Sequence, residues 1–129
     1  MTSVASVAEV DGGPSRPRAR CKVWVERDGA VLLSEWRVAL LEAVAATGSL
    51  ARAADRLGVP YRTAWDRIRE TEEHLGIRLL VTESGGAEGG GSRLTPEASD
   101  LIARFQRVTA GVDELIAGRF RAELGDALG

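Results

Sequence analysis

Two short amphipathic segments, separated by a glycine and a proline, stand out in the pattern of apolar and polar residues. In the first segment the apolar residues recur at i, i+3, i+4 and i+7, which is one face of a helix; they are Leu50, Ala53, Ala54 and Leu57. A second helical pattern follows Gly58-Val59-Pro60, with apolar positions at Tyr61, Ala64, Trp65, Ile68 and Leu75. Two helices joined by a short turn with glycine predict a helix-turn-helix, whose second helix enters the DNA major groove.

Capping residues and charge support this prediction. Ser49 can cap the first helix, Gly58 can end it in the left-handed conformation, and Pro60 suits the first turn of the second helix. Between residues 49 and 69 the chain carries five arginines against two aspartates. The alternative is an αα-hairpin in a helical domain whose arginines form a solvated face, because motifs of this kind also occur by chance.

A β-hairpin and a further helix precede the motif. Residues 21–33 alternate in polarity around Asp28-Gly29, a dipeptide that favours a two-residue hairpin turn because both positions need positive φ. Ser34 is a plausible cap for a helix over residues 35–47. We expect that helix to pack behind the helix-turn-helix as a scaffold.

A glycine-rich segment follows the motif. Ile77–Thr82 is a β-compatible run, residues 84–92 read SGGAEGGGS, and Arg93-Leu94-Thr95 follows. Strand, tip and strand predict a β-hairpin at the position where winged-helix proteins carry a wing, with backbone N–H groups and Arg93 available for phosphates. The alternative is a plain flexible linker. A nucleotide-binding P-loop is excluded because the Gly-Lys-Ser/Thr ending and a βαβ unit are both missing.

The C-terminal quarter predicts one long helix. Thr95-Pro96-Glu97 has the composition of a helix start, with a cap, a first-turn proline and an acid near the positive end of the dipole. Apolar residues then recur with heptad spacing, which is typical of a helix that pairs with another; they are Leu101, Phe105, Val108, Val112 and Leu115. Such a stripe could fold back on its own domain. We expect homodimerisation instead, which would present two recognition helices to a pseudo-palindromic site.

Composition restricts the function. The chain has 129 residues and a formal net charge of −2, so it is long enough for one core, and any DNA binding must come from a local basic face. Cys21 is the only cysteine and His74 the only histidine. We therefore expect no disulfide, no metal site, no cofactor and no enzymatic activity. Without a signal peptide or an apolar run of membrane-spanning length, a cytoplasmic, nucleoid-associated protein is expected.

The sequence at both ends of the chain predicts flexible tails. Residues 1–20 contain glycines, prolines and three arginines without periodicity, which is typical of a disordered segment. That segment could instead be an arm that reaches the minor groove. Residues 125–129 are expected to be a flexible C-terminus.

The segments TGSLARAADRLGVPYRTAWDRI and LGIRLLVT, the GG-x-x-GGGSRLT wing and the helix after it resemble one family. The chain is similar to the N-terminal DNA-binding domain of molybdate-responsive ModE regulators, a LysR-like winged helix. The resemblance covers residues 22–123. It implies that Tyr61, Arg62 and Thr63 meet the groove and that Arg93, with the neighbouring Gly90, Gly91 and Ser92, meets the backbone. At Pro60, relatives often have a serine whose hydroxyl this chain lacks.

These observations give one leading hypothesis. The fold is expected to be mainly α with small β-hairpins, a winged helix-turn-helix over residues 21–95 followed by a dimerisation helix over residues 96–124. Its function would be sequence-specific binding of double-stranded DNA as a homodimeric transcriptional regulator. Arg62 and Thr63 would read bases, while Ser49, Arg52, Tyr61 and Arg67 would contact phosphates.

The alternative function is that of a protein–protein adaptor on the same scaffold. The oxyanion-binding barrel domains of full-length ModE regulators have no counterpart in the sequence, so molybdate sensing is not expected. An unidentified regulatory protein is a further candidate partner.

Overall fold

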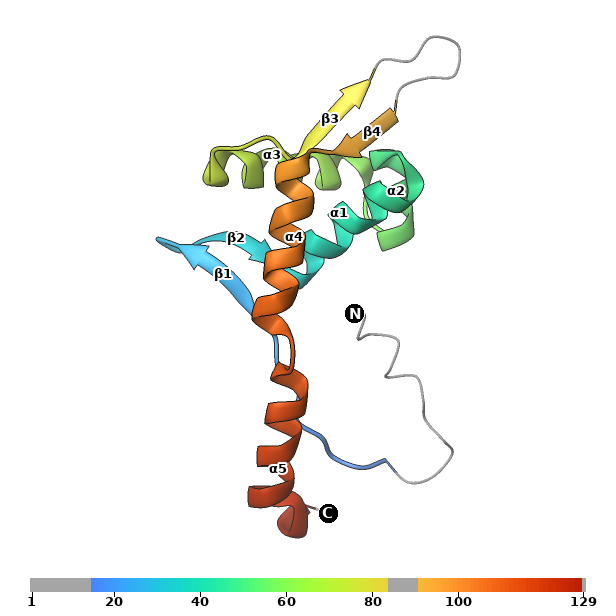
Figure 1. The fold of residues 1–129 in the computed structure, drawn as a ribbon. Helices are drawn as coiled ribbons and strands as arrows, with labels where there is room; N and C mark the ends of the chain where they lie inside the picture. The colour runs from blue at the N-terminus through green and yellow to red at the C-terminus, as the bar shows by residue number, and fades with distance from the viewer. Residues whose placement is uncertain (1–14, 84–90, 129) are drawn as a thin grey trace. The chain divides into compact units, whose positions relative to one another are not determined.

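Three helices form the centre of the unit Lys22–Ala110 (Figure 1). The structure is a computed structural model that describes residues 15–83 and 91–128. The three helices are α1 (Glu35–Thr47), α2 (Leu50–Leu57) and α3 (Tyr61–Leu75). The turns between them are short because α1 and α2 each end at a glycine in the left-handed region, with φ of 76° at Gly48 and 73° at Gly58. The helices therefore lie where the capping pattern predicts them.

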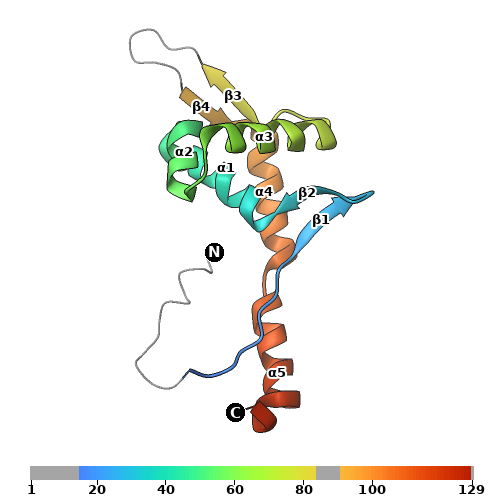
Figure 2. The ribbon, with the colours of Figure 1, turned by 180° about the vertical axis from the view of Figure 1, so that it is seen from behind.

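Small residues allow these helices to pack closely. Ala53 and Ala54 of α2 and Ala64 of α3 are buried completely or almost so, so the backbones of the helix-turn-helix approach without intervening bulk. Leu40 and Val44 of α1 fill the space behind them. Seen from behind, α3 lies across the front of α1 while α4 (Pro96–Thr109) lies on its far side (Figure 2). The packing thus leaves one long side of α3 facing outward.

Two antiparallel hairpins flank the helices. The strands β1 (Trp24–Arg27) and β2 (Ala30–Ser34) pair across Asp28 and Gly29, whose φ values of 52° and 83° confirm the predicted turn. The second hairpin pairs β3 (Leu80–Glu83) with β4 (Gly91–Leu94), and its register runs from Leu80 opposite Leu94 to Glu83 opposite Gly91. It projects from the helices on the side of α2 (Figure 1). The predicted tip, residues 84–90, lies outside the described residues.

The prediction of one continuous helix over residues 96–124 is wrong. The helix begins as expected, with the Thr95 hydroxyl accepting a hydrogen bond from the Ala98 N–H at 3.0 Å. It stops at Thr109, because Ala110 is extended (φ −62°, ψ 130°) and Gly111 has a φ of 80°. A separate helix, α5 (Val112–Leu128), follows. Residues 125–128, expected to be flexible, are helical.

The residues of the predicted heptad stripe lie in two different environments, one buried and one exposed. Phe105 is buried in the core of its own unit, and Leu101 packs against that core, so these two residues face inward. Val108 and Leu115, by contrast, are 61% and 55% exposed, and Val112 is half-buried. The prediction of one outward-facing seam is therefore wrong for Leu101 and Phe105, since the apolar face of α4 completes the domain core.

The remaining segments of the chain are described by themselves. Residues 15–20 form neither helix nor strand, and residues 1–14 of the predicted tail lie outside the described residues. Within the described ranges, no helix combines the length and the apolar character needed to cross a membrane.

Candidate nucleic-acid interface

The N-terminus of α3 has no side-chain cap, and in this sense it is open. Gly58 and Val59 donate their backbone N–H groups to the carbonyls of Asp55 and Ala54, both at 3.0 Å, and so close the turn. Pro60 then occupies the N-cap position of α3 without any side-chain hydrogen bond to the helix. The first turn carries no acidic residue, so the N–H groups there and the positive end of the helix dipole remain available to an anion such as a phosphate.

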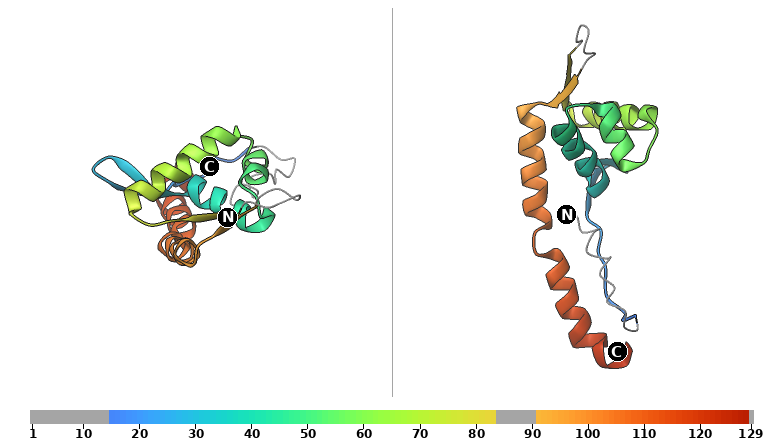
Figure 3. Two further views of the ribbon diagram at one scale, coloured as in Figure 1. Left: turned by 90° about the horizontal axis from the view of Figure 1, so that it is seen from above. Right: turned by 90° about the vertical axis from the view of Figure 1, so that its right-hand side faces the viewer.

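The first two turns of α3 carry exposed side chains of the kinds that contact DNA. Tyr61 is 52% exposed and the side chain of Arg62 is 79% exposed, while Thr63 is half-buried. Arg62 forms an ion pair with Asp66 one turn later, with 3.4 Å between Nε and Oδ1. Seen from the side, α3 lies on the opposite face of the unit from α4 (Figure 3, right). Three of the predicted contact residues thus lie together at the N-terminal end of α3.

Arg67 has a different environment from Arg62. It lies 3.7 Å from the Glu70 carboxylate, which also takes a 3.1 Å contact from the guanidinium of Arg37 on α1. Burial lowers the pKa of Arg37, Glu70 raises it in part, and Arg67 lowers it further. Nε of Arg37 is buried without a hydrogen-bond partner among the described residues. Arg67 therefore belongs to a cluster that holds α3 against α1, and it remains half-exposed for a phosphate.

The N-terminus of α2 is capped by the side chain of Ser49. The Ser49 hydroxyl accepts a hydrogen bond from the Arg52 N–H at 3.1 Å, as the capping prediction requires. Its proton is still available to donate to a phosphate oxygen, because a hydroxyl both accepts and donates. Arg52 is exposed, and the described part of the chain offers it no ion pair. Both residues can contact the phosphate backbone of DNA, while Ser49 also stabilises α2.

The base of the second hairpin is attached to the turn between α1 and α2. Ser92 donates its backbone N–H to the Gly48 carbonyl at 2.9 Å. A Cβ on Gly91 would lie 3.2 Å from that same oxygen, which explains why glycine suits this close approach. Arg93 is exposed and donates from Nε to Glu83 across the hairpin at 3.0 Å. Gly90, the fourth predicted wing residue, lies outside the described residues.

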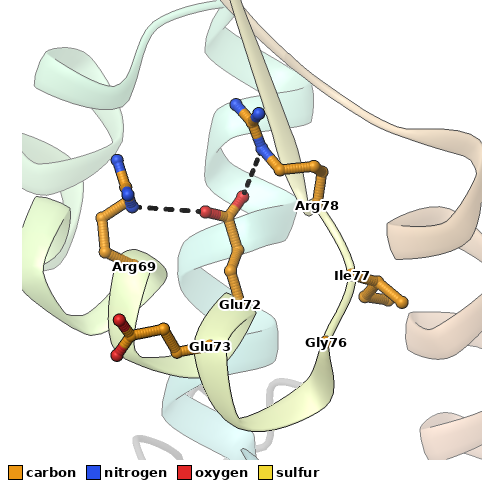
Figure 4. Close-up of a pocket in the computed structure, with 6 residues that line it drawn as sticks. All are labelled: Arg69, Glu72, Glu73, Gly76, Ile77 and Arg78. Atoms are coloured by element: carbon orange, nitrogen blue, oxygen red, sulfur yellow. Dashed lines mark ion pairs between the residues drawn. The ribbon is translucent and has the colours of Figure 1, made fainter.

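Glu72 is a buried residue at the base of the site that the sequence pattern did not single out. Its carboxylate is 8% exposed and accepts from the N–H groups of Leu79 at 2.8 Å and Leu80 at 3.2 Å. The guanidinium groups of Arg69 and Arg78 approach it at 3.6 and 3.7 Å (Figure 4). A shallow hollow surrounds this cluster. Because the carboxylate joins the end of α3 to the start of β3, it fixes the second hairpin relative to α3.

The sequence carried a weak signal for Glu72. It lies four residues after the buried Ile68, on the buried side of α3, and an acid at such a position needs partners. The strand β3 begins at Leu80 rather than at Ile77. Just before it, Leu79 directs its N–H to Glu72, while its carbonyl accepts from the Thr95 N–H at 2.9 Å.

A family model matches residues 37–99, the segment from α1 to the start of α4. Its description is "Bacterial regulatory helix-turn-helix protein, lysR family". This segment is therefore similar to the helix-turn-helix domain of the LysR family. The predicted fold class, mainly α with small β-hairpins in a winged helix-turn-helix, is confirmed, since the structural neighbours are winged-helix DNA-binding domains.

Curated relatives confirm the resemblance to ModE regulators. The chain is 38% identical over 110 residues to the molybdenum-pterin-binding protein MopB of Rhodobacter capsulatus, covering 85% of this chain and 40% of that protein. It is 45% identical over 70 residues to the molybdenum transport protein ModE of Herbaspirillum seropedicae, covering 54% and 26%. The DNA-binding transcriptional dual regulator ModE of Escherichia coli K12 is 34% identical over 77 residues, covering 55% and 29%. The chain spans less than half the length of each of these relatives.

Two solved structures with a similar fold are complexes with DNA. The DNA-binding domain of BenM in complex with catB site 1 DNA matches with a TM-score of 0.50 and 25% identity, covering 68% of this chain and 93% of that one. The same domain with benA site 1 DNA gives a TM-score of 0.50 and 25% identity, with coverage of 67% and 92%. The fold of this chain therefore matches nearly the whole of a DNA-bound domain.

Proposed function

We propose that this chain is the DNA-binding part of a transcriptional regulator that recognises a specific sequence. The observation that carries the proposal is the open N-terminus of α3, where Tyr61 and Arg62 are exposed beside unbonded N–H groups. A helix end of this kind can hold a phosphate while the adjacent side chains reach base edges. The match to DNA-bound domains and to relatives that are regulators supports the same conclusion.

The second hairpin completes the proposed contact surface. Its attachment to Gly48 and to Glu72 fixes it relative to both helices of the motif. Arg93 and the backbone of Gly91 and Ser92 would then follow the phosphate backbone at the edge of the site contacted by α3. In this arrangement α3 specifies the sequence and the wing sets the register of the protein on the duplex.

We further propose that two copies bind a pseudo-palindromic site. Apolar side chains remain exposed on both C-terminal helices, among them Val108 of α4 and Leu115, Leu124 and Leu128 of α5. Exposed residues of this type favour association with another chain. Pairing of two identical chains would present two recognition helices with two-fold symmetry.

Selection of bound sites from random DNA at near-physiological salt tests this function. The wild-type chain should enrich one sequence with two half-sites, and Arg62→Ala should lose about 1–3 kcal/mol of discrimination at the base it contacts. Sedimentation of the free protein should show a dimer. If no sequence is enriched, or if affinity does not depend on salt concentration, the regulator proposal fails and the adaptor alternative gains support.

A further inference from the structure

Asp66 is an acidic side chain on the surface that is proposed to meet DNA. It is 51% exposed, and only its Oδ1 makes the contact with Arg62. Phosphates repel a carboxylate, and they offer it no donor. The base edges of the major groove differ in this respect, because cytosine N4 and adenine N6 carry amino groups that donate. An acid in this position therefore favours a base edge over the backbone.

The geometry of the ion pair leaves the reading atoms of Arg62 available. Asp66 approaches the guanidinium through Nε, so the two Nη groups can donate in parallel to O6 and N7 of a guanine. A carboxylate has about four lone-pair positions, which means that Asp66 can accept another hydrogen bond while it orients Arg62. Arg62 can therefore contact a guanine through its Nη groups while Asp66 accepts a second hydrogen bond, because the two contacts use different atoms.

The spacing along the helix restricts where such an amino group can lie. Four residues of α-helix advance about 6 Å along the axis, since each residue contributes about 1.5 Å. Successive base pairs are about 3.4 Å apart. An acceptor one turn after Arg62 therefore meets a base within about two steps of the guanine that Arg62 contacts.

We infer that Asp66 is a specificity-determining residue that reads the exocyclic amino group of a cytosine or adenine next to the guanine read by Arg62. This inference rests on the proposed function and adds the chemistry of a second base to it. Asp66 also lowers binding to DNA of unrelated sequence, because it places a negative charge among the contacts to phosphates. Arg62 without Asp66 would bind the backbone or a guanine with less selectivity.

The test measures affinities for the selected site and for all its single-base variants, together with random DNA at the same salt concentration. Asp66→Ala removes the acceptor, and Asp66→Asn keeps the shape while it removes the charge. Asp100→Ala is the matched control, because Asp100 forms an exposed i,i+4 pair with Arg104 at 2.8 Å on α4. Thermal unfolding of each variant, followed by circular dichroism, verifies that the fold is retained.

Asp66→Ala should reduce the preference for cytosine or adenine about tenfold at one position within two base pairs of the guanine. Substituting each of these two bases in turn distinguishes which amino group is read. Both Asp66 variants should bind random DNA more tightly than the wild type, while Asp100→Ala should match the wild type on all DNAs. The double variant with Arg62→Ala should lose no more at this position than Asp66→Ala alone.

Three outcomes would overturn the inference. If both Asp66 variants retain every base preference within twofold while Arg62→Ala relaxes one, Asp66 reads no base and the regulator function still stands. If they strengthen binding to every sequence equally, Asp66 contributes charge alone and no base contact. If the wild type itself binds all sequences equally, the proposed function fails, and the role of Asp66 fails with it.

Discussion

Removal of the Glu72 carboxylate should destabilise the domain more than any surface substitution on α3. The carboxylate is almost completely buried, and it accepts from two backbone N–H groups, those of Leu79 and Leu80. In Glu72→Ala both N–H groups would lose their partner inside the protein. Hydrogen bonds to charged groups contribute about 1.5–3 kcal/mol each. The nearby guanidinium groups are mostly exposed, so their pairs add little.

The expected loss in the free energy of unfolding for Glu72→Ala is about 3–6 kcal/mol. That is a large share of the stability of a small domain, which is about 5–15 kcal/mol. With an m-value of about 1.5 kcal/mol per molar urea, a loss of about 3 kcal/mol lowers the urea midpoint by about 2 M. Both N–H groups bind the same oxygen, Oε2, so Glu72→Gln can keep both hydrogen bonds through its amide oxygen. It loses only the charge and should lose about half as much stability.

The neighbouring residue supplies the control. Glu73 is exposed on the same helix, and in Figure 4 its side chain points away from the cluster. Glu73→Ala should change stability by less than about 0.5 kcal/mol. Hydrogen exchange at Leu79 and Leu80 gives a second measurement, because both amides should lose protection in Glu72→Ala. If Glu72→Ala unfolds at the same urea concentration as Glu73→Ala and both amides stay protected, the assigned role of the buried carboxylate is wrong.

Two paired substitutions test the other structural conclusions. Gly91→Ala places a methyl group 3.2 Å from the Gly48 carbonyl oxygen, so it should lower DNA affinity and reduce stability by about 1 kcal/mol. In Gly125→Ala the added methyl group meets nothing within 4 Å, so this variant should raise the helicity of α5. Titration with DNA and circular dichroism measure these effects; equal affinity for Gly91→Ala and the wild type would refute the tight contact. Phe105→Ala should cost about 3–5 kcal/mol because it empties the core, while Val108→Ala should leave unfolding unchanged and weaken dimers. Urea unfolding and sedimentation separate the two, and a Phe105→Ala chain as stable as the wild type would contradict the core assignment.

Local chemistry explains why most of the fold could be predicted from the sequence. The turn at Asp28-Gly29 and the caps at Ser49 and Thr95 depend only on residues close in the chain, so their sequence signals are sufficient. The small residues at the crossing of α2 and α3 also have one simple explanation. For the candidate site, the exposure of Tyr61 and Arg62 follows from their place on the outer side of an amphipathic helix.

Long-range contacts explain what the sequence did not reveal. The heptad pattern continues through residue 110, but Phe105 is taken up by the domain core, which leaves no single stripe for a partner helix. The break at Gly111 could not be located either, since Gly118 and Gly125 lie inside a helix while Gly111 adopts a left-handed φ. Glu72 gains its role from N–H groups seven and eight residues away, in a segment that looked like the start of a strand.

The pairing of charges explains how a chain with a net charge of −2 can present a surface to DNA. Arg62 and Arg93, two exposed residues among the proposed contacts, each have an acid beside them, Asp66 and Glu83. Exposed pairs of this kind contribute at most about 1 kcal/mol, so phosphates and bases can displace or share them at small cost. The same acids reduce the net positive charge that an unrelated duplex would meet. Because non-specific affinity depends on the number of phosphates neutralised, pairing at Arg62 and Arg93 lowers affinity for unrelated DNA, and binding becomes strong where base contacts add to the charge.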